Sequence, residues 1–438
     1  MLLHAPGSSY FLIICEFATL PLSIMADIHL TSDPITVDQI EAIARSKLQR
    51  NVYEYYSCGS DDQTAVERNR TDFDRLLILP RVLRDVSRID TSTRLFSHRF
   101  PIPIGIAPSA MQRLASPEGE LDVARAAASM GLNITLSSNA TTSLEDVMVA
   151  RRQGGETAAP FWFQIYLASN LTLSVPIIKR AEAAGFEALV LTVDSPVLGN
   201  RINERLAPLV LPEGIHLANL KQQDTQGPRK PSFNRQIMDA RTAKQAKDLM
   251  QAAGDTANSA SLTWGSTFEF LRQTTSMKII LKGVMAPEDA QLAVECGADA
   301  IIVSNHGGRQ LDCVPSTIQA LPGIAEVVKG KIPIILDGGI RRGSDVFKAL
   351  ALGADFVLVG RSALWGLAFN GQAGVETVMN ILERELNRTM ALAGVAQLQN
   401  ICSSFPTPFR RRTSKQFMNF KFDLQYASNQ GASLPLVG

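Results

Sequence analysis

The chain has 438 residues, which is enough for one large α/β barrel or for two to three smaller domains. Its 43 lysines and arginines balance 42 aspartates and glutamates, so the charge predicts neither nucleic-acid binding nor attraction to an anionic membrane. The five cysteines show no regular spacing, which argues against a disulfide framework or a zinc site and favours a reducing compartment such as the cytoplasm.

The first segment with a recognisable pattern is apolar and runs from Tyr10 to Met25. It resembles the apolar part of a secretion signal, but no basic region precedes it and it contains Glu16. It is also shorter than the roughly 20 residues that span a bilayer. A targeting role is therefore the alternative, and we expect residues 1–30 to be a disordered extension with Met25 as a natural protein start.

Eight short apolar runs follow, each bounded by turn-forming residues, as is typical of buried strands. They cover residues 102–110, 133–138, 161–166, 188–194, 278–283, 300–308, 332–339 and 356–361. Helical patterns lie between most of them, which predicts a parallel sheet covered by helices on both faces. Eight strands favour a closed (β/α)₈ TIM barrel over residues 31–401. An open doubly wound sheet is the alternative, but no G-x-G-x-x-G follows the first strand.

Three of these helices have recognisable ends in the sequence. One is predicted over residues 116–131, where Ser116 and Pro117 open it and a glycine closes it. The other two are predicted over residues 287–297 and 344–353, and each also ends at a glycine.

Polar residues close seven of the eight predicted strands, at the end where a barrel places its active site. They are Ser109, Ser137, Gln164, Tyr166, Thr192, Asp194, Lys282, Ser304, His306 and Asp337. One such ending is usually a cap or a satisfied core group, but several that converge predict a working site. Lys282 in particular would be costly to bury alone, so it predicts an anionic or electron-rich partner.

The loops after the last two strands, DGGIRRGSD and GRSA, predict a phosphate site. Gly338 and Gly339 allow backbone N–H groups to approach a ligand closely, and Arg341 and Arg361 supply charge-assisted hydrogen bonds. The alternative is that the two glycines only form a tight turn between strand and helix.

His306 and Arg309 are separated by two glycines only, and both side chains suggest chemistry. His306 is a candidate general base because the pKa of histidine lies near neutrality, and Asp194 could orient its imidazole. Arg309 offers a fork of N–H groups suited to a carboxylate. A base beside a carboxylate anchor suggests an acid substrate attacked at the carbon next to its carboxyl group.

Six motifs then carry a family resemblance. They are YEYYSCGSDDQ, IAPSAMQRLASPEGE, LTVDSP, ILKGV, SNHGGRQLD and LDGGIRRGSDVFKALALGA, in this order along the chain. Together they closely resemble the FMN-dependent α-hydroxy-acid oxidase and dehydrogenase family from Ile35 to Ile401. The resemblance implies oxidation of an L-2-hydroxy acid to the 2-oxo acid with bound FMN. It also implies dioxygen or a separate electron acceptor, and a homo-oligomer, often a tetramer.

The resemblance also implies roles by position. His306 matches the base and Asp194 its partner. The substrate-binding positions are Arg201 and Arg309 for the carboxylate, with Tyr55 and Tyr166 for the carboxylate and the hydroxyl. The FMN positions are Pro108, Ser109, Ala110, Ser137, Gln164, Thr192, Lys282, Ser304, Asp337, Gly338, Gly339, Arg341, Gly360 and Arg361. The resemblance places Lys282 near the N1–O2 edge of the flavin and implies no metal.

Several of these side chains have a structural alternative. Packing or hydrogen bonding within the fold would also account for Tyr55, Tyr166, Ser109, Ser137 and Thr192, and a surface salt bridge would account for Arg201. Asp312 and Cys313 are interpreted as structural, with Asp312 as a turn or helix cap.

The chain departs from the family pattern in three places. Asn139 stands where glycolate oxidases carry a tryptophan over the substrate, which favours a bulkier or more polar 2-hydroxy acid than glycolate. Residues 206–262, between the fourth and fifth strands, are expected to form a mobile lid. Residues 402–438 are expected to be a disordered tail without the peroxisomal Ser-Lys-Leu ending, and the absence of a haem domain before residue 30 argues against electron transfer to a fused haem.

Two other functions stay open from the sequence. A barrel that binds a phosphorylated substrate directly would need no flavin. A flavin-binding paralogue without turnover is the other, although His306, Asp194 and Arg309 argue against it.

Overall fold

The structure is a computed structural model that describes residues 33–155, 158–220, 236–237, 239–254, 258–401 and 406–407. The extension predicted over residues 1–30 lies outside the described residues. So does the tail predicted over residues 402–438, apart from residues 406–407.

Within the described residues, eight parallel strands form a barrel, as predicted. They are β4 (Ile104–Ile106), β5 (Thr135–Ser137), β6 (Trp162–Ile165), β7 (Ala188–Thr192), β8 (Lys278–Val284), β9 (Ala300–Val303), β10 (Ile334–Asp337) and β11 (Phe356–Val359). Their order in the sheet is β4-β11-β10-β9-β8-β7-β6-β5. A parallel bridge between Ile106, in β4, and Ile134, just before β5, joins the two edges of the sheet, so the ring is closed and the open-sheet alternative is wrong.

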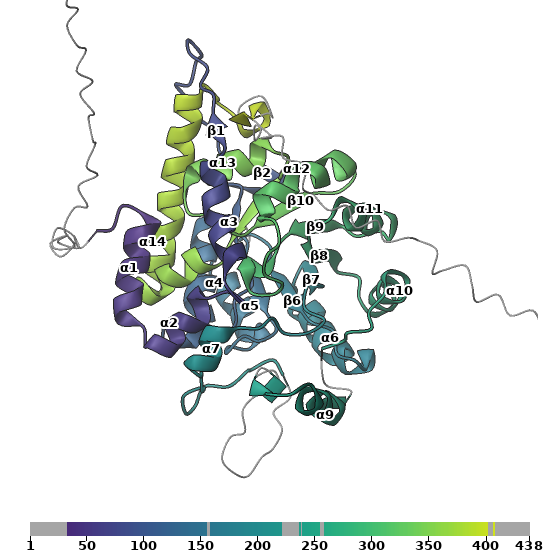
Figure 1. Cartoon of the computed structure of the whole chain (residues 1–438). Helices are drawn as coiled ribbons and strands as arrows, with labels where there is room; N and C mark the ends of the chain where they lie inside the picture. Colours follow the sequence, from purple (N-terminus) through teal and green to yellow (C-terminus); the bar gives the residue numbers. More distant parts are fainter. Residues whose placement is uncertain are drawn as a thin grey trace, which may run out of the picture.

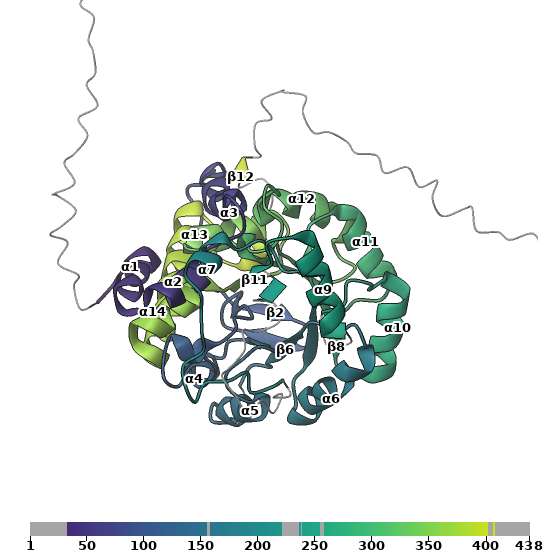
Figure 2. The ribbon, with the colours of Figure 1, turned by 60° about the horizontal axis from the view of Figure 1, so that its bottom comes forward.

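Helices surround the strands, as the end-on view of Figure 2 shows. The helices of the described residues are α1 (Val37–Lys47), α2 (Arg50–Ser57), α3 (Thr64–Asp74), α4 (Glu120–Met130), α5 (Leu144–Arg152), α6 (Val175–Ala184), α7 (Ile202–Leu206), α9 (Ala243–Ala253), α10 (Trp264–Thr274), α11 (Pro287–Glu295), α12 (Thr317–Val328), α13 (Gly343–Ala351) and α14 (Arg361–Ala393). Short 3₁₀ turns span Gln112–Leu114, Leu171–Ser174, His306–Gly308 and Leu398–Asn400. In Figure 1, α1 lies beside the long α14, which places the start of the described chain against its last long helix.

The predicted C-terminal ends of the three helices, at glycines, are correct, and the predicted start of one helix is wrong. Gly131 caps α4 in the left-handed conformation with φ 66°, and Gly297 and Gly353 follow α11 and α13 with positive φ. Helix α4, however, begins at Glu120 rather than at Ser116. Gly119, with φ 52° and ψ −117°, separates the preceding turn from the helix, so Ser116 and Pro117 lie before the helix.

The inner face of the barrel changes from apolar to polar along each strand. Side chains alternate between the two faces of a strand, so every second residue points inward. Trp162, Val190, Ile280 and Ile335 belong to a buried cluster inside the barrel. Two residues further on come Gln164, Thr192, Lys282 and Asp337, so the same inner rows end in polar groups at the carboxyl ends of the strands.

A hairpin closes the opposite end of the barrel. Strands β2 (Thr93–Leu95) and β3 (His98–Phe100) pair antiparallel, and Leu95 and Phe100 join the inner cluster. The ring of Phe100 lies 5.1 Å from that of Phe356, at the start of β11. A further two-stranded sheet pairs β1 (Leu77–Ile78) with β12 (Pro406–Thr407). Since apolar side chains of the described residues fill this end, the carboxyl ends of the strands are the open end of the barrel, where α7 and α9 lie in front in Figure 2.

Candidate active site

A cavity of about 970 Å³ opens at the carboxyl ends of the strands. Every residue that the sequence assigned to the site lines this cavity, with the exceptions of Asp194 and Ser304. Those two lie directly behind the wall, where Asp194 contacts His306 and Ser304 contacts Lys282. Residues as far apart in the chain as Tyr55 and Arg361 are thus brought to one place.

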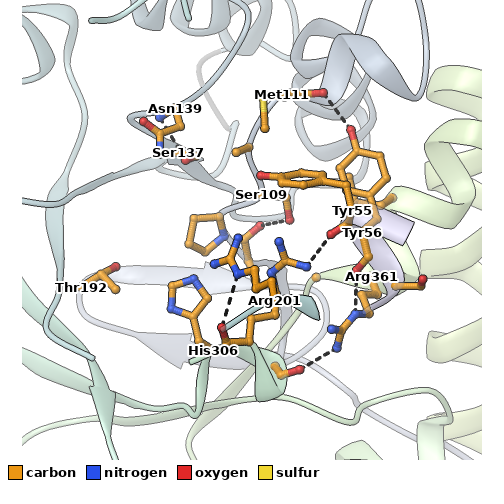
Figure 3. A pocket seen from close by; sticks show the side chains of 18 of the residues that line it. Tyr55, Tyr56, Ser109, Met111, Ser137, Asn139, Thr192, Arg201, His306 and Arg361 are labelled. Carbon is orange, nitrogen blue, oxygen red and sulfur yellow. Dashed lines mark hydrogen bonds between the residues drawn. The ribbon is translucent and has the colours of Figure 1, made fainter. Parts of the chain in front are cut away.

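His306 and Asp194 form a base and its orienting partner. The two are joined by a contact of 2.8 Å between His306 Nδ1 and Asp194 Oδ1. The Tyr166 hydroxyl lies 3.4 Å from His306 Nε2, and the two rings stack. Because Asp194 accepts from Nδ1–H, Nε2 of the neutral imidazole is the unprotonated nitrogen. Nε2 faces the cavity, and Figure 3 shows the imidazole beside Arg201.

The pKa values of this pair favour a neutral base beside a charged carboxylate. Burial lowers the pKa of His306 against the opposing attraction of Asp194. Burial alone would raise the pKa of Asp194, but His306 and Lys282 outweigh it, so the pKa of this carboxyl is lowered. His306 is therefore free to accept a proton, and Asp194 remains an anion that stabilises the resulting imidazolium.

The glycines after His306 are required by the turn. His306, Gly307 and Gly308 have successive φ values of 57°, 65° and 76°, all in the left-handed region. A Cβ atom on Gly308 would lie 2.7 Å from the side chain of Val66. This tight turn brings His306 and Arg309 to the same cavity, which explains why only glycines separate them.

Arg201 and Arg309 lie together beside His306. Both donate to one oxygen, Glu204 Oε1, from Arg201 Nη1 at 3.2 Å and from Arg309 Nη2 at 2.9 Å. The guanidinium of Arg309 also lies 5.0 Å from the centre of the Tyr55 ring, which the sequence placed in the same subsite. Arg201 is buried rather than held in a surface ion pair, so the surface alternative is wrong.

Lys282 has the anionic partner that the sequence predicted. Its ammonium lies 3.1 Å from Asp337 Oδ2 and donates to Ser304 Oγ at 2.9 Å. The same Ser304 hydroxyl accepts the backbone N–H of His306 at 3.1 Å. Ser304 therefore connects Lys282 to the turn that carries the base.

A row of hydroxyl and amide groups continues along the neighbouring strands. Ser137 Oγ donates to Gln164 Oε1 at 3.3 Å, and Gln164 Nε2 donates to Thr192 Oγ1 at 3.0 Å. On the other side of this row, Pro108, Ser109 and Ala110 form the cavity wall after β4. These groups form a polar edge that could hydrogen-bond the heteroatoms of a flavin ring.

The two predicted phosphate arginines have different surroundings. Arg341 forms ion pairs with Asp38 and Glu41 of α1. These two residues lie 303 and 300 positions earlier in the chain. Arg361 donates to the backbone carbonyl groups of Tyr56, Gly307 and Cys58. Burial lowers the pKa of Arg361 to about 9, with a smaller contribution from Arg309. Arg361 therefore connects the loops around the cavity by hydrogen bonds to their backbone.

The residues present fit FMN. Asp337 Oδ1 is buried and finds no hydrogen-bond partner within the described part of the chain, so it can accept from a ribityl hydroxyl. Gly338 and Gly339, with φ 93° and 86°, leave backbone groups exposed to a ligand, and a Cβ atom on Gly360 would meet only Ala107, at 3.8 Å. A cationic end, a polar edge and a side-chain-free wall are what a phosphorylated flavin requires.

Glu204, which lines the cavity, and Gln310, which lies behind its wall, are among the residues that sequence reasoning missed. Glu204 could have been found from its spacing, because it follows Arg201 by three positions on one helical turn. Gln310 could not, since its amide holds the backbone of Asp194, Val197 and Gly199 by contacts across more than 100 positions. Asp312 is a helix cap, as expected: it accepts the backbone N–H groups of Thr64 and Ala65 at the start of α3.

The described residues also bear on membranes and metals. None of the helices in the described ranges has both the length and the apolar character needed to cross a membrane. In the same ranges, no group of three or more His, Cys, Asp and Glu side chains could hold a metal ion.

Comparison with known proteins gives consistent matches. The model of the family described as "FMN-dependent dehydrogenase" matches residues 44–407. A 2-hydroxyacid oxidase of Dictyostelium discoideum is 42% identical over 370 residues, which cover 84% of this chain and 89% of that protein. An L-lactate oxidase of Nostoc sp. is 44% identical over 384 residues, covering 85% and 98%. A crystal structure of mandelate oxidase superposes with a TM-score of 0.73 and 35% identity, covering 85% of this chain and 98% of that one.

Proposed function

The chain belongs to the FMN-dependent dehydrogenase family and is an FMN-dependent oxidoreductase of the 2-hydroxy-acid oxidase type, and on this premise we propose which residues perform the reaction. The reaction converts an L-2-hydroxy acid and dioxygen to the 2-oxo acid and hydrogen peroxide. The observation that carries the proposal is the position of the His306 and Asp194 pair beside Arg201 and Arg309, on the wall of one cavity.

Arg201 and Arg309 bind the substrate carboxylate. Two guanidinium groups side by side provide the fork of N–H groups that a carboxylate accepts. Tyr55, next to Arg309, donates to the same carboxylate, and Tyr166 donates to the substrate hydroxyl. Burial raises the pKa values of Tyr55 and Tyr166, so both phenols stay protonated and act as donors.

His306 accepts at Nε2 the proton released from the substrate's Cα–OH centre. Asp194 holds the imidazole by Nδ1 and stabilises the positive charge that the ring then carries. The bound FMN supplies the acceptor for the two electrons that leave the substrate. His306 and the electron acceptor together account for both hydrogens that the substrate loses.

The cofactor positions divide into a phosphate end and a ring. Gly338, Gly339, Arg341, Gly360 and Arg361 would hold the ribityl phosphate. Lys282, fixed by Asp337 and Ser304, would place a positive charge at the N1–O2 edge of the ring, where it stabilises negative charge. The ring positions are Pro108, Ser109, Ala110, Ser137, Gln164, Thr192 and Ser304.

We also propose a homotetramer in the cytoplasm and a lid over residues 206–262, of which residues 221–235, 238 and 255–257 lie outside the described residues. The family resemblance supports the tetramer, and the free thiols of Cys58, Cys296 and Cys313 support a reducing compartment. Residues 208–211 and 215–217 line the cavity mouth, which supports a covering role for this part of the chain. Light scattering of the purified protein tests the tetramer.

The experiment that tests the reaction measures its stoichiometry. The purified yellow protein is given a 2-hydroxy acid in air, and oxygen uptake, peroxide and 2-oxo acid are measured together. Equal amounts of the three are expected. Formation of 2-oxo acid only on addition of an artificial electron acceptor, without oxygen uptake, would contradict dioxygen as the acceptor.

A further inference from the structure

Three segments of the chain meet at one part of the cavity wall, and their side chains there are mostly apolar. The backbone N–H of Met111 donates to the Asn139 carbonyl at 3.2 Å, and that of Ala218 donates to the Ala140 carbonyl at 3.0 Å. The loops after β4 and β5 and the segment after α7 are therefore packed side by side. We refer to this wall as the apolar wall; its cavity-lining members are Met111, Leu209, Leu211, Ile215 and Leu217.

The apolar wall is only partly covered by the protein itself. All five of its side chains are half-buried, although each faces a cavity. Leu209 also packs against the main hydrophobic core, so the wall has a supported position. Covering half-exposed apolar surface is favourable in proportion to its area, which favours an apolar occupant.

Asn139 leaves room in front of this wall. It is short, half-buried and lines the same cavity, and Figure 3 shows it beside Ser137 and near Met111. Its backbone N–H donates to Ser137 Oγ at 3.1 Å, which fixes the loop after β5. The sequence left open whether this position favours a bulkier or a more polar substrate. The apolar neighbours favour a bulkier side chain over a polar one, because a charged chain would lose its water beside them.

The segment after α7 is continuous with the carboxylate site. Arg201 immediately precedes α7, and Leu209 follows the helix by three positions. Asn219 anchors the far end of the segment, since its Oδ1 accepts the Leu144 N–H at 2.8 Å and its Nδ2 donates to the Thr142 carbonyl at 3.1 Å. One short, anchored stretch thus presents a carboxylate anchor at one end and apolar side chains beyond it.

Resting on the proposed function, we infer that the substrate is a 2-hydroxy acid whose side chain is apolar and larger than a methyl group. Its carboxylate lies between Arg201 and Arg309, and its side chain covers the apolar wall in front of Asn139. Glycolate, which has no side chain, would leave the apolar wall exposed to water.

The test compares acids that differ only in the side chain. The holoenzyme is assayed with glycolate, lactate, 2-hydroxyhexanoate, 2-hydroxyoctanoate and 2-hydroxyglutarate, and calorimetry measures binding of the matching 2-oxo acids. We expect kcat/KM and the affinity to rise roughly fourfold with each added methylene and 2-hydroxyglutarate to be poor. A preference for glycolate, lactate or 2-hydroxyglutarate overturns the inference while leaving the proposed reaction intact. An enzyme that oxidises none of them contradicts the proposed function, and the inference falls with it.

Two variants locate the side-chain site. Leu217→Asn makes the wall polar, and Asn139→Trp fills the space in front of it. Each is expected to lower the ratio of kcat/KM for 2-hydroxyoctanoate over lactate at least about fivefold, and the exposed Leu311→Asn serves as the matched control. Flavin absorbance shows whether each variant is folded. Only a variant that retains FMN is used to compare the two substrates. An unchanged ratio in the folded variants overturns the placement.

A separate observation concerns Glu204, which is nearly fully buried between the two guanidinium groups. Two positive charges held together repel each other, and burial followed by Arg309 lowers the pKa of Arg201, while Glu204 opposes that shift. The single Glu204 Oε1 accepts from both arginines. Also resting on the proposed function, we infer that Glu204 is a positioning residue that holds Arg201 and Arg309 together and orients them toward the substrate carboxylate.

Charged and neutral ligands distinguish positioning from packing. For Glu204→Gln, the dissociation constant of a 2-oxo acid is expected to rise at least roughly tenfold, with KM rising more than kcat falls, and that of the matching 2-oxo amide to change less than about twofold. Glu204→Asp keeps the charge and should recover part of the loss. Equal weakening of acid and amide shows a packing role, and tighter acid binding shows that Glu204 competes with substrate; either overturns the inference. Wild-type enzyme that binds no 2-oxo acid contradicts the proposed function instead.

Discussion

The Nδ1 atom of His306 lies 2.8 Å from Oδ1 of Asp194, across 112 positions of the chain. This contact fixes both the orientation and the tautomer of the imidazole. A base that acts at Nε2 needs this arrangement, because the proton must reside on the other nitrogen before the reaction begins.

Replacing Asp194 by asparagine keeps the shape of the side chain but removes its charge. We expect Asp194→Asn to lower kcat/KM by about 10²- to 10⁴-fold, since the imidazolium loses its counter-ion and the tautomer is no longer fixed. Steady-state kinetics measure this, with exposed Asp62→Asn as the control. A loss below about threefold would remove Asp194 from the proton transfer.

The pH profile reports the ionisation of His306. Its pKa is lowered by burial, so the acid limb of kcat/KM is expected below the ordinary histidine value of about 6.5. Activity should fall tenfold per pH unit below that pKa, because the protonated ring cannot accept a proton. Asp194 opposes the lowering, so Asp194→Asn should move the limb to still lower pH. A limb above about 6.5 would contradict this assignment of the base.

The same shift has a consequence for stability. A histidine with a lower pKa in the folded protein binds fewer protons there than in the unfolded chain. Its contribution to the free energy of unfolding is therefore present above about pH 6.5 and is lost as the pH falls toward the folded pKa.

Arg309→Met removes one carboxylate anchor. We expect kcat/KM for the 2-hydroxy acid to fall at least about hundredfold, because a thioether side chain cannot donate hydrogen bonds to a carboxylate. An uncharged 2-hydroxy amide should change by less than about threefold, and exposed Arg94→Met should change neither. Equal losses for acid and amide would show that Arg309 acts through the fold.

Gly339 and Gly330 form a matched pair, with φ 86° and 80°. A Cβ atom on Gly339 would collide with the carbonyl oxygen of Asn69, whereas nothing lies within 4 Å of one on Gly330. Gly330→Ala should cost about 1 kcal/mol from the left-handed backbone alone, and Gly339→Ala about 3 kcal/mol or more together with weaker FMN retention. Denaturant unfolding and flavin release measure these effects. Similar costs for both would show that the collision is relieved.

The sequence predicted the barrel because its signal is local. Short apolar strands, helices that end at glycines and polar strand ends can each be recognised within about ten residues. The strand-end residues became a site as soon as the strands were placed in one ring. His306, Lys282 and Gln164 followed from this step alone.

What the sequence could not supply depends on distant contacts. The pairing of Arg341 with Asp38 and Glu41 joins segments that lie far apart in the chain, and nothing near Arg341 predicts it. The start of α4 was wrong because Gly119 interrupts a pattern that Ser116 and Pro117 would otherwise open. The apolar wall was also hidden, since its residues come from three segments that only the fold brings together.

The central claim is that His306 removes the proton whose loss allows electrons to leave the substrate. Anaerobic mixing of the holoenzyme with a 2-hydroxy acid, followed by flavin absorbance, tests this in a single turnover for wild type and His306→Gln. We expect both proteins to bind FMN, and the absorbance of the variant to fall at least about a hundredfold more slowly. Bleaching of the variant at the wild-type rate would contradict the claim.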